Sequence, residues 1–212
     1  MRLYFIDMLK ALYYCHNIIK VIHRDIKPEN IMLNHNLEAV LIDFGVSSLV
    51  EQQDLVLLKD SLGTLTFFSP EMVSSKVTGS AVIRGEKTDI WALGITFYQL
   101  LTGQLPFSYA TNPFILKEAI LHDEIDFSLI PQSNIQEVIQ SMLKKNPNRR
   151  ARIADLLQSD WVTNSGKETI NVTKIDALNQ GDQSTTSNHS FGNLNRLMTL
   201  TKLGKSSVQI NM

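Results

Sequence analysis

The stretch His-Arg-Asp-Ile-Lys-Pro-Glu-Asn, residues 23–30, places several reactive side chains at short fixed spacings. The carboxylate of Asp25 could accept a proton from a hydroxyl group, and Lys27 could hold the negative charge of a group in transfer. Asn30 and Asp43 both offer oxygen atoms to a hard cation such as Mg²⁺. Alone, each residue could be an ordinary turn residue or solvated charge. Together they form the set that phosphoryl transfer requires, because its catalysis consists mostly of positioning and charge stabilisation.

A small hairpin is expected to bring these residues together. Two short apolar runs, 30–33 and 39–42, are separated by a polar stretch, which predicts a β-hairpin. The hairpin would place Asn30 and Asp43 close to each other. Gly45 follows Phe44 and is expected to let the backbone turn sharply beside the metal ligand.

Helices are predicted over most of the remaining chain up to about residue 162. Apolar periodicity and capping residues predict helices at 2–16, from Pro70 onward, and at 89–102, 113 onward, 134–145 and 151–158. Thr88 is expected to precede the third of these and Gly103 to end it. Asn112 is the expected cap of the next, and Ser133 with Gln136 fits a capping box. The fold class is therefore mainly α, with one small hairpin at the candidate site.

Composition narrows the classes of function. The chain has 212 residues, of which 43% are hydrophobic and 19% charged, enough for one domain with a core. A net charge of −1 gives no field that attracts nucleic acid or an anionic membrane, so neither is an expected partner. Cys15 is the only cysteine, which excludes an internal disulfide and favours a reducing compartment. We expect a cytoplasmic protein, with a nuclear location left open.

The composition changes after Thr163. The sequence beyond it is rich in Asn, Ser, Thr, Gly and Gln and poor in large apolar side chains, so it is not expected to bury enough surface to fold alone. The prediction is a mostly helical lobe at 1–162, followed by a flexible tail at 163–212.

The motifs of the lobe resemble those of the protein kinase family, in the same order. The stretch at 23–30 resembles the catalytic loop, and Asp-Phe-Gly at 43–45 resembles the metal-binding segment. Further resemblances are GTLTFFSPE (63–71) to the end of the activation segment, DIWALG (89–94) to the central buried helix, and NPNRR (146–150) to the approach to the last helix. SPE stands where the family usually has APE. The resemblance covers residues 2–162 and implies the fold of the family's large C-terminal lobe.

This resemblance implies roles for the reactive residues. Asp25 is expected to orient the substrate hydroxyl and to accept its proton. Lys27 makes the pattern resemble kinases that act on serine and threonine. Asn30 and Asp43 are expected to hold Mg²⁺. The implied cofactors are ATP and Mg²⁺, and the implied partner is a protein substrate.

The resemblance also implies residues that bind the nucleotide. Met32 and Ile42 are expected to line the adenine side of the pocket, with Glu29 near the ribose.

Other matched residues are expected to support the site. Arg24 matches a residue that pairs with a phosphate on the activation segment in many kinases. Thr64 is expected to contact the catalytic loop rather than to be phosphorylated. Asp89 is expected to brace the backbone of that loop, and Glu71 to pair with Arg150 inside the lobe.

The features of the family's small lobe have no counterpart in the sequence. None of its ten glycines forms a Gly-x-Gly, and nothing resembles the Val-Ala-Ile-Lys strand or the helix with its partner glutamate. Because several groups that stabilise the transition state are missing, almost no activity is expected of the isolated chain. We interpret the sequence as a fragment of a complete kinase. The alternative is a one-lobed interaction protein without catalysis.

Within the family, the motifs look closest to the calcium/calmodulin-dependent protein kinase kinases and related upstream kinases. The similar stretches are VIHRDIKPEN, DFGVSSLV, GEKTDIWALGITFYQLLTGQLPF and SFGN. This implies a protein substrate that could itself be a kinase. Residues 193–205 are basic and carry leucines at helical spacing, which would suit calmodulin. A disordered tail with scattered leucines is the favoured alternative for this segment.

Overall fold

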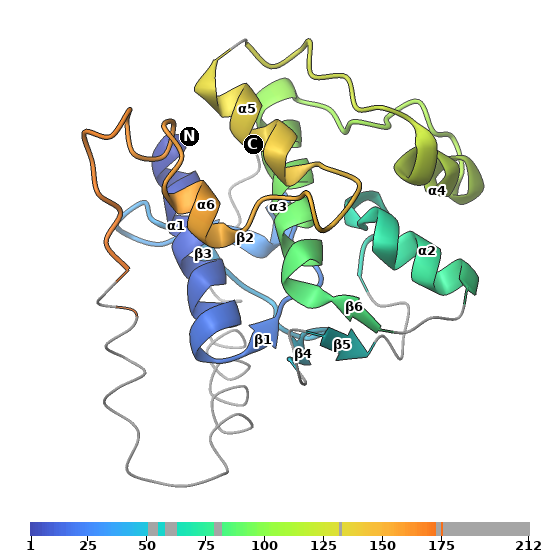
Figure 1. Cartoon of the computed structure of the whole chain (residues 1–212), viewed down its shortest axis with the longest axis horizontal. Helices are drawn as coiled ribbons and strands as arrows, with labels where there is room; N and C mark the ends of the chain where they lie inside the picture. Colours follow the sequence, from blue (N-terminus) through green and yellow to red (C-terminus); the bar gives the residue numbers. More distant parts are fainter. Residues whose placement is uncertain (51–54, 58–62, 79–81, 132, 173–174, 176–212) are drawn as a thin grey trace, which may run out of the picture.

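The computed structural model describes residues 1–50, 55–57, 63–78, 82–131, 133–172 and 175. The helices are α1 (Arg2–Tyr13), α2 (Pro70–Thr78), α3 (Gly85–Thr102), α4 (Pro113–His122), α5 (Asn134–Met142) and α6 (Ile153–Leu157) (Figure 1). A π-helical turn, Tyr14–Ile18, continues α1, and short 3₁₀ turns cover Pro28–Asn30 and Leu65–Phe67. The segment 193–205, considered above for calmodulin, lies outside the described residues.

Short antiparallel strand pairs lie among the helices. The predicted hairpin is confirmed: β2 (Ile31–Leu33) pairs with β3 (Ala39–Leu41), with Ile31 opposite Leu41. In addition, β1 (Val21–Ile22) pairs with β4 (Ser48–Leu49), and β5 (Leu55–Leu57) pairs with β6 (Val82–Arg84). A mainly helical fold with a small hairpin is therefore what the described residues show.

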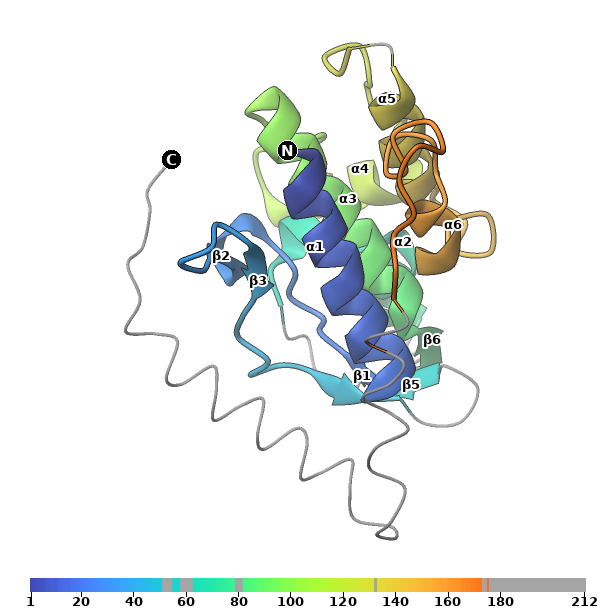
Figure 2. The ribbon, with the colours of Figure 1, turned by 90° about the vertical axis from the view of Figure 1, so that its left-hand side faces the viewer.

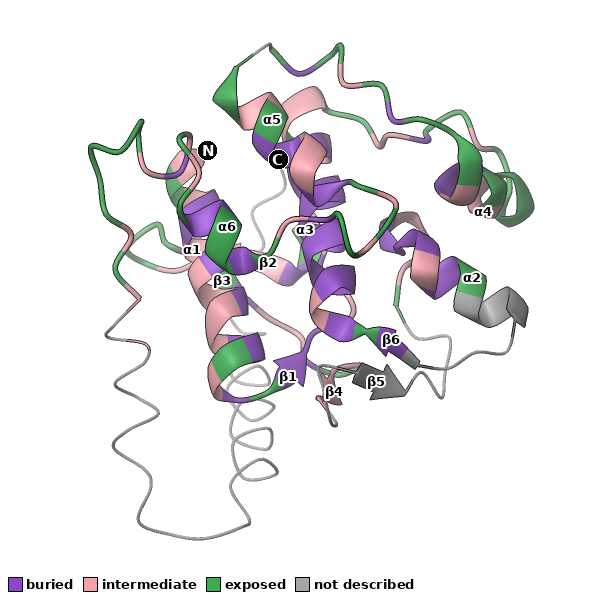
Figure 3. Cartoon of the chain, viewed as in Figure 1, coloured by how far each residue is buried: buried purple, intermediate pink, exposed green. Residues whose placement is uncertain are grey.

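Helix α3 forms the centre of the core. It is apolar on nearly all sides, which is the pattern of a buried helix, and its residues are buried almost continuously from Gly85 to Tyr98 (Figure 3). Helix α1 runs beside it (Figure 2), and the ring of Phe5 meets that of Phe97 edge-on at 4.7 Å between centroids. Gly94 lets α5 approach closely, because a Cβ atom there would lie 2.8 Å from Leu143.

Two of the expected helix ends are confirmed. Asn112 Oδ1 accepts hydrogen bonds from Phe114 N and Ile115 N, both at 3.0 Å, and so caps α4. Gly103 adopts the left-handed conformation, with φ 76°, directly after α3.

Two other predictions about helix ends are wrong. Helix α3 begins at Gly85 instead of residue 89, and the hydroxyl of Thr88 donates to the Gly85 carbonyl within the first turn. Ser133 does not cap α5: its hydroxyl donates to Pro131 O, and Gln136 Nε2 donates to the carbonyl of Phe127. The capping box failed because loop carbonyls nearby compete for the same side chains.

Helix α5 also ends earlier than predicted, at Met142 instead of residue 145. The carbonyls of Lys144 and Lys145 instead accept hydrogen bonds from Arg150, at 3.0 and 3.2 Å.

The described chain continues against the lobe beyond Thr163. Arg2 forms an ion pair with Glu168 at 2.7 Å, and Ile170 and Val172 pack against the core. Across the residues that are described, no helix is both long and apolar enough to cross a lipid bilayer.

Candidate active site

The loop after β1 is fixed by one buried carboxylate on the central helix. Asp89, near the start of α3, accepts hydrogen bonds from His23 N at 2.8 Å and from Arg24 N at 2.9 Å. Arg24 has a φ of 73°, a left-handed conformation that is unfavourable for a side chain with a Cβ atom. The two bonds to Asp89 hold the loop in this conformation immediately before Asp25.

His16 is a supporting residue that the sequence did not reveal. It lies in the π-helical turn, is buried, and places its Nε2 atom 2.8 Å from Asp89 Oδ2. The contact joins residues 73 positions apart, so no local pattern could predict it. The π-helical turn that positions His16 became visible only in the structure, and such turns are frequent at functional sites.

Asp25 is held from both sides by hydrogen-bond donors. The backbone N and the hydroxyl of Thr64 both donate to Asp25 Oδ1 at 3.0 Å, and Lys27 Nζ lies 2.8 Å from Asp25 Oδ2. Lys27 Nζ also donates to Thr64 Oγ1 at 2.8 Å. Burial acts to raise the pKa of Asp25, but the hydrogen bonds from Lys27 and Thr64 outweigh it and leave that pKa below its ordinary value. Asp25 is therefore ionised at neutral pH.

Gly63 permits the close approach of Thr64 to the loop. Its φ is 108°, and a Cβ atom there would lie 2.9 Å from the carbonyl oxygen of Arg24 and 3.6 Å from Asp25 Oδ1. Any larger residue would push these segments apart.

Asn30 joins Asp25 to the hairpin. Its Nδ2 atom donates to the Asp25 carbonyl at 2.7 Å and to Asp25 Oδ2 at 3.1 Å, which leaves the amide oxygen on the other side of the group. Ile42 N donates to Asn30 O at 2.9 Å, so Asp43 follows directly from the residue paired with Asn30. The hairpin thus brings the two predicted metal ligands to the same end of β2 and β3.

The sharp turn at this point was assigned to the wrong residue. Asp43 itself has the left-handed conformation, with φ 64°, whereas Gly45 is not among the glycines with positive φ. Gly45 N instead donates to Asp43 Oδ1 at 3.2 Å, and a Cβ atom on Gly45 would lie 3.0 Å from the same oxygen. A non-glycine residue held in this conformation is strained, and such strain is frequent at functional sites.

The histidine of the loop packs under the hairpin as a neutral ring. His23 meets Phe44 at 4.7 Å between centroids, its Nε2 atom donates to Ile42 O at 3.0 Å, and its Nδ1 atom accepts from Asp25 N at 3.3 Å. Burial lowers the pKa of His23, in agreement with one nitrogen that donates and one that accepts.

The predicted nucleotide residues lie along the hairpin side of the site. Met32 on β2 and Ile42 after β3 are half-buried, and Glu29 in the 3₁₀ turn is exposed. Arg24 is directed towards the segment after Asp43, where its Nη1 atom donates to Ser48 Oγ at 2.7 Å.

A second polar cluster lies deeper in the lobe. Arg150 donates to both carboxylate oxygens of Glu71, at 2.6 and 2.9 Å, and to the Lys87 carbonyl at 2.6 Å. Its guanidinium also lies 5.1 Å from the centre of the Trp91 ring. The expected ion pair between Glu71 and Arg150 is therefore present, and it ties the start of α2 to the loop before α6.

Comparisons with known proteins identify the family. The family model for the protein kinase domain matches residues 1–162, and the chain belongs to the protein kinase family. It is 33% identical over 200 residues to CBL-interacting protein kinase 10 of Oryza sativa subsp. japonica, covering 91% of this chain and 42% of that protein. It is 32% identical over 168 residues to Aurora kinase A-B of Xenopus laevis, covering 78% of this chain and 38% of that protein.

A third relative is named as a serine/threonine kinase. The chain is 34% identical over 166 residues to a probable serine/threonine-protein kinase of Dictyostelium discoideum, covering 78% of this chain and 23% of that protein. The chain thus spans less than half the length of these three relatives.

Proposed function

We propose that the chain is the large lobe of a serine/threonine kinase, which transfers the γ-phosphate of ATP to a hydroxyl group of a protein substrate. The observation that carries the proposal is the meeting of Asp25 with Lys27, Asn30 and Thr64 within 3.1 Å. The carboxylate of Asp25 lies beside the ammonium of Lys27, and the amide of Asn30 connects Asp25 to the hairpin that precedes Asp43. This carboxylate and this cation fit the roles of a general base and a phosphate-binding group.

In this proposal each group has a separate task. The ionised carboxylate of Asp25 orients the substrate hydroxyl and accepts its proton. Lys27 lies between Asp25 and Thr64, where its charge can stabilise the transferring phosphoryl group. The two hydrogen bonds from Thr64 fix the orientation of the Asp25 carboxylate.

The available donors suit Mg²⁺. Asp43 contributes a carboxylate, and Asn30 contributes an amide oxygen because its nitrogen is already bonded to Asp25. Mg²⁺ in phosphoryl-transfer sites is held by one or two such oxygens together with substrate phosphates and water. When bound, the ion would neutralise charge on the phosphates.

Met32 and Ile42 would contact the adenine from the side of the β2–β3 hairpin, and Glu29 would lie near the ribose. Groups that cover the phosphates are not supplied by these 212 residues, since no Gly-x-Gly occurs among them. We therefore propose that turnover depends on a second lobe.

The substrate is proposed to be another kinase, because VIHRDIKPEN and DFGVSSLV resemble the corresponding stretches of kinases that act on other kinases. A cytoplasmic location is proposed because the chain has a single cysteine.

A second candidate is a one-lobed protein that binds a kinase or its substrate without turnover. The missing phosphate-covering loop favours it, whereas the complete set of Asp25, Lys27, Asn30 and Asp43 favours the enzyme.

The test uses labelled ATP and phosphoamino-acid analysis. We would assay the 212-residue chain and the protein translated with any in-frame upstream sequence, each as wild type and as Asp43→Ala. The enzyme proposal predicts phosphoserine or phosphothreonine only with the longer protein, and loss of both in Asp43→Ala. Captured partners that are identical for wild type and Asp43→Ala, with no ATP binding and no transfer by either length, would contradict it and support the second candidate.

A further inference from the structure

The chain stays in contact with the lobe after its last helix. The match to the family model ends at residue 162, whereas residues 163–172 continue beside α1 (Figures 1 and 2). Arg2, in the first turn of α1, donates from Nη1 to Val162 O at 2.8 Å and from Nη2 to Glu168 Oε1 at 2.7 Å. Residues 163–172 are called the strap below, and Arg2 joins both its beginning and its middle to α1.

The first half of the strap is a tight turn that presents Glu168 to α1. Glu168 N donates to Thr163 O at 2.8 Å, and Asn164 Nδ2 donates to Glu168 Oε1 at 3.0 Å. Asn164, Ser165 and Gly166 all have left-handed conformations, with φ 54°, 57° and 78°. Such conformations are unfavourable for residues with a Cβ atom, so the contacts of the turn must compensate for their cost.

The second half of the strap has one side on the protein. Ile170 and Val172 are half-buried and pack against the core, and they alternate with Thr169 and Asn171, which are exposed. This alternation is typical of an extended segment with one apolar side. The ion pair of Arg2 is partly exposed and contributes little by itself, so the two apolar side chains are expected to supply most of the attachment.

Helix α1, which the strap holds, also supports the hairpin of the candidate site. Asp7 Oδ2 accepts a hydrogen bond from Ala39 N, at the start of β3, at 3.0 Å. Across the hairpin, Asn34 N and Ile42 N donate to the opposite strand, and the alternation of an antiparallel ladder then directs Ala39 N out of the hairpin. Ala39 is buried, and a buried amide without an acceptor is costly. Asp7 therefore fixes the free edge of the hairpin to α1.

We propose that the strap holds the first turn of α1 in place and, through Asp7, positions the hairpin that leads to the metal-binding residues. Arg2 and Asp7 are five residues apart on one helix, about 7.5 Å along its axis. Asp7 bonds the start of β3, and Asp43 follows two residues after the end of that strand. Its consequence for the metal site rests on the proposed function, whereas the link from strap to hairpin does not.

The test follows amide hydrogen exchange by NMR in the full 212-residue chain, because exchange reports local opening. Two amides report on the proposed link: Phe5 N, which donates to Met1 O in the first turn of α1, and Ala39 N. Leu116 N, which donates to Asn112 O in α4, is the reference. In the double variant Ile170→Ser with Val172→Ser, exchange at the two reporters should be about tenfold faster or more, and exchange at the reference should not change.

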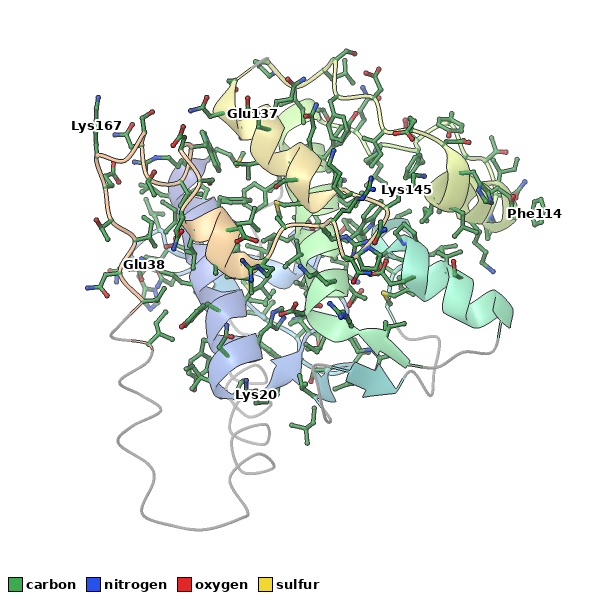
Figure 4. The ribbon with its side chains drawn as sticks, in the orientation of Figure 1. Lys20, Glu38, Phe114, Glu137, Lys145 and Lys167 are labelled. Atoms are coloured by element: carbon green, nitrogen blue, oxygen red, sulfur yellow. The ribbon has the colours of Figure 1, made fainter. Side chains whose placement is uncertain are left out.

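A milder change in the strap guards against loss of folding. Glu168→Gln removes only the charge that Arg2 meets, and should speed exchange at Phe5 and Ala39 by about twofold to fivefold. Lys167→Gln is the matched control, because it removes the neighbouring charge. Figure 4 shows Lys167 pointing away from the body of the molecule, so this variant should exchange like wild type.

A combined variant tests whether the strap acts through Asp7. Asp7→Ala should speed exchange at Ala39 and leave Phe5 unchanged, while Asp7→Asn, which keeps an acceptor oxygen, should restore most of the protection of Ala39. When Asp7→Ala is combined with the double serine variant of the strap, exchange at Ala39 should rise no further, although exchange at Phe5 still rises.

Three outcomes would overturn the inference. The first is equal acceleration at Phe5, Ala39 and Leu116 in the double serine variant, which would mean general destabilisation. The second is unchanged exchange at Ala39 in that variant. The third is acceleration at Ala39 that adds to the effect of Asp7→Ala, which would show a route that bypasses this residue. All of these readouts are independent of phosphate transfer, so failure of the strap and failure of the kinase function are distinguishable.

Discussion

The lobe contains two polar clusters built from the same kinds of residues, one around Arg150 and one around Asp25. In the Arg150 cluster every guanidinium nitrogen donates to Glu71 or to a backbone carbonyl, and the side chain is fully buried. In the Asp25 cluster the side chains of Asp25 and Lys27 keep 14% and 21% of their surface exposed. Arg24 and Asp43, on either side of it, hold left-handed backbone conformations.

This difference in burial distinguishes the Arg150 cluster, which supports the fold, from the Asp25 cluster, whose groups can react with a ligand. A closed, buried network has no free position for a substrate, and removal of one partner leaves an unpaired buried charge. A half-open network with strained neighbours is less stable than it could be, but its groups are accessible to a ligand. Stability should therefore depend most on the Arg150 cluster, and activity on the Asp25 cluster.

The largest effect on stability is expected at Arg150. Arg150→Leu leaves Glu71 without its partner and removes three hydrogen bonds to carbonyls, so the free energy of unfolding should fall by about 3–5 kcal/mol. Urea denaturation of the 212-residue chain measures the change. Arg152→Leu is the matched control, because its ion pair with Asp155 is exposed and should contribute much less to stability. Similar losses in the two variants would show that the Arg150 cluster is not the main support of the fold.

A smaller effect is expected at the glycine beside Asp25. Gly63→Ala forces a Cβ atom to 2.9 Å from the Arg24 carbonyl at a φ of 108°, and should lower stability by about 2–3 kcal/mol. At Gly103 the φ is also positive, but nothing lies within 4 Å of the added atom, so Gly103→Ala should lower it by only about 1 kcal/mol. Thermal unfolding compares the two, and an equal effect would mean that the contact of Gly63 with the loop does not constrain it.

The smallest effect is a pH dependence that sharpens the view of Asp25 as an ionised group. Its folded pKa is below the ordinary value of 3.8, so it contributes stability that is present above that value and is lost as pH falls through the folded pKa. The difference in unfolding free energy between wild type and Asp25→Asn should therefore be constant near neutral pH and shrink below about pH 4. In Thr64→Val, which lacks the hydroxyl bond, the folded pKa should lie closer to the ordinary value, so the decline should be smaller and complete at a higher pH. Parallel curves for wild type and Asp25→Asn would contradict the lowered pKa.

Local sequence patterns predicted the hairpin, the cap at Asn112 and the end of α3 at Gly103, because each depends on residues close in the chain. The same reasoning failed at Ser133 and Thr88, which were expected to lie at the starts of helices. The hydroxyl of Ser133 donates to the loop carbonyl of Pro131, and that of Thr88 donates to the Gly85 carbonyl inside the buried first turn of α3. Patterns of this kind compete with contacts that only the folded chain supplies.

The reactive residues of the candidate site were visible in the sequence, but their supports were not. Asp25, Lys27 and Asn30 lie within six positions of one another. In contrast, His16 contacts Asp89, 73 positions later, and Gly63 approaches the loop from 38 positions after Asp25. The left-handed turn at Asp43 also differs from the sequence-based expectation, because glycine adopts positive φ most readily and Gly45 lies only two residues later. These features depend on tertiary packing, which short spacings do not encode.

The most direct measurement is the rate of phosphate transfer by Asp25→Asn in the protein that includes any upstream lobe. Asparagine keeps the size of the side chain but cannot accept the proton, so kcat should fall by about 10²–10⁴-fold while ATP affinity stays within about twofold. Loss of ATP affinity with an unchanged kcat, or an unchanged rate, would contradict the assignment of Asp25 as the base of a serine/threonine kinase.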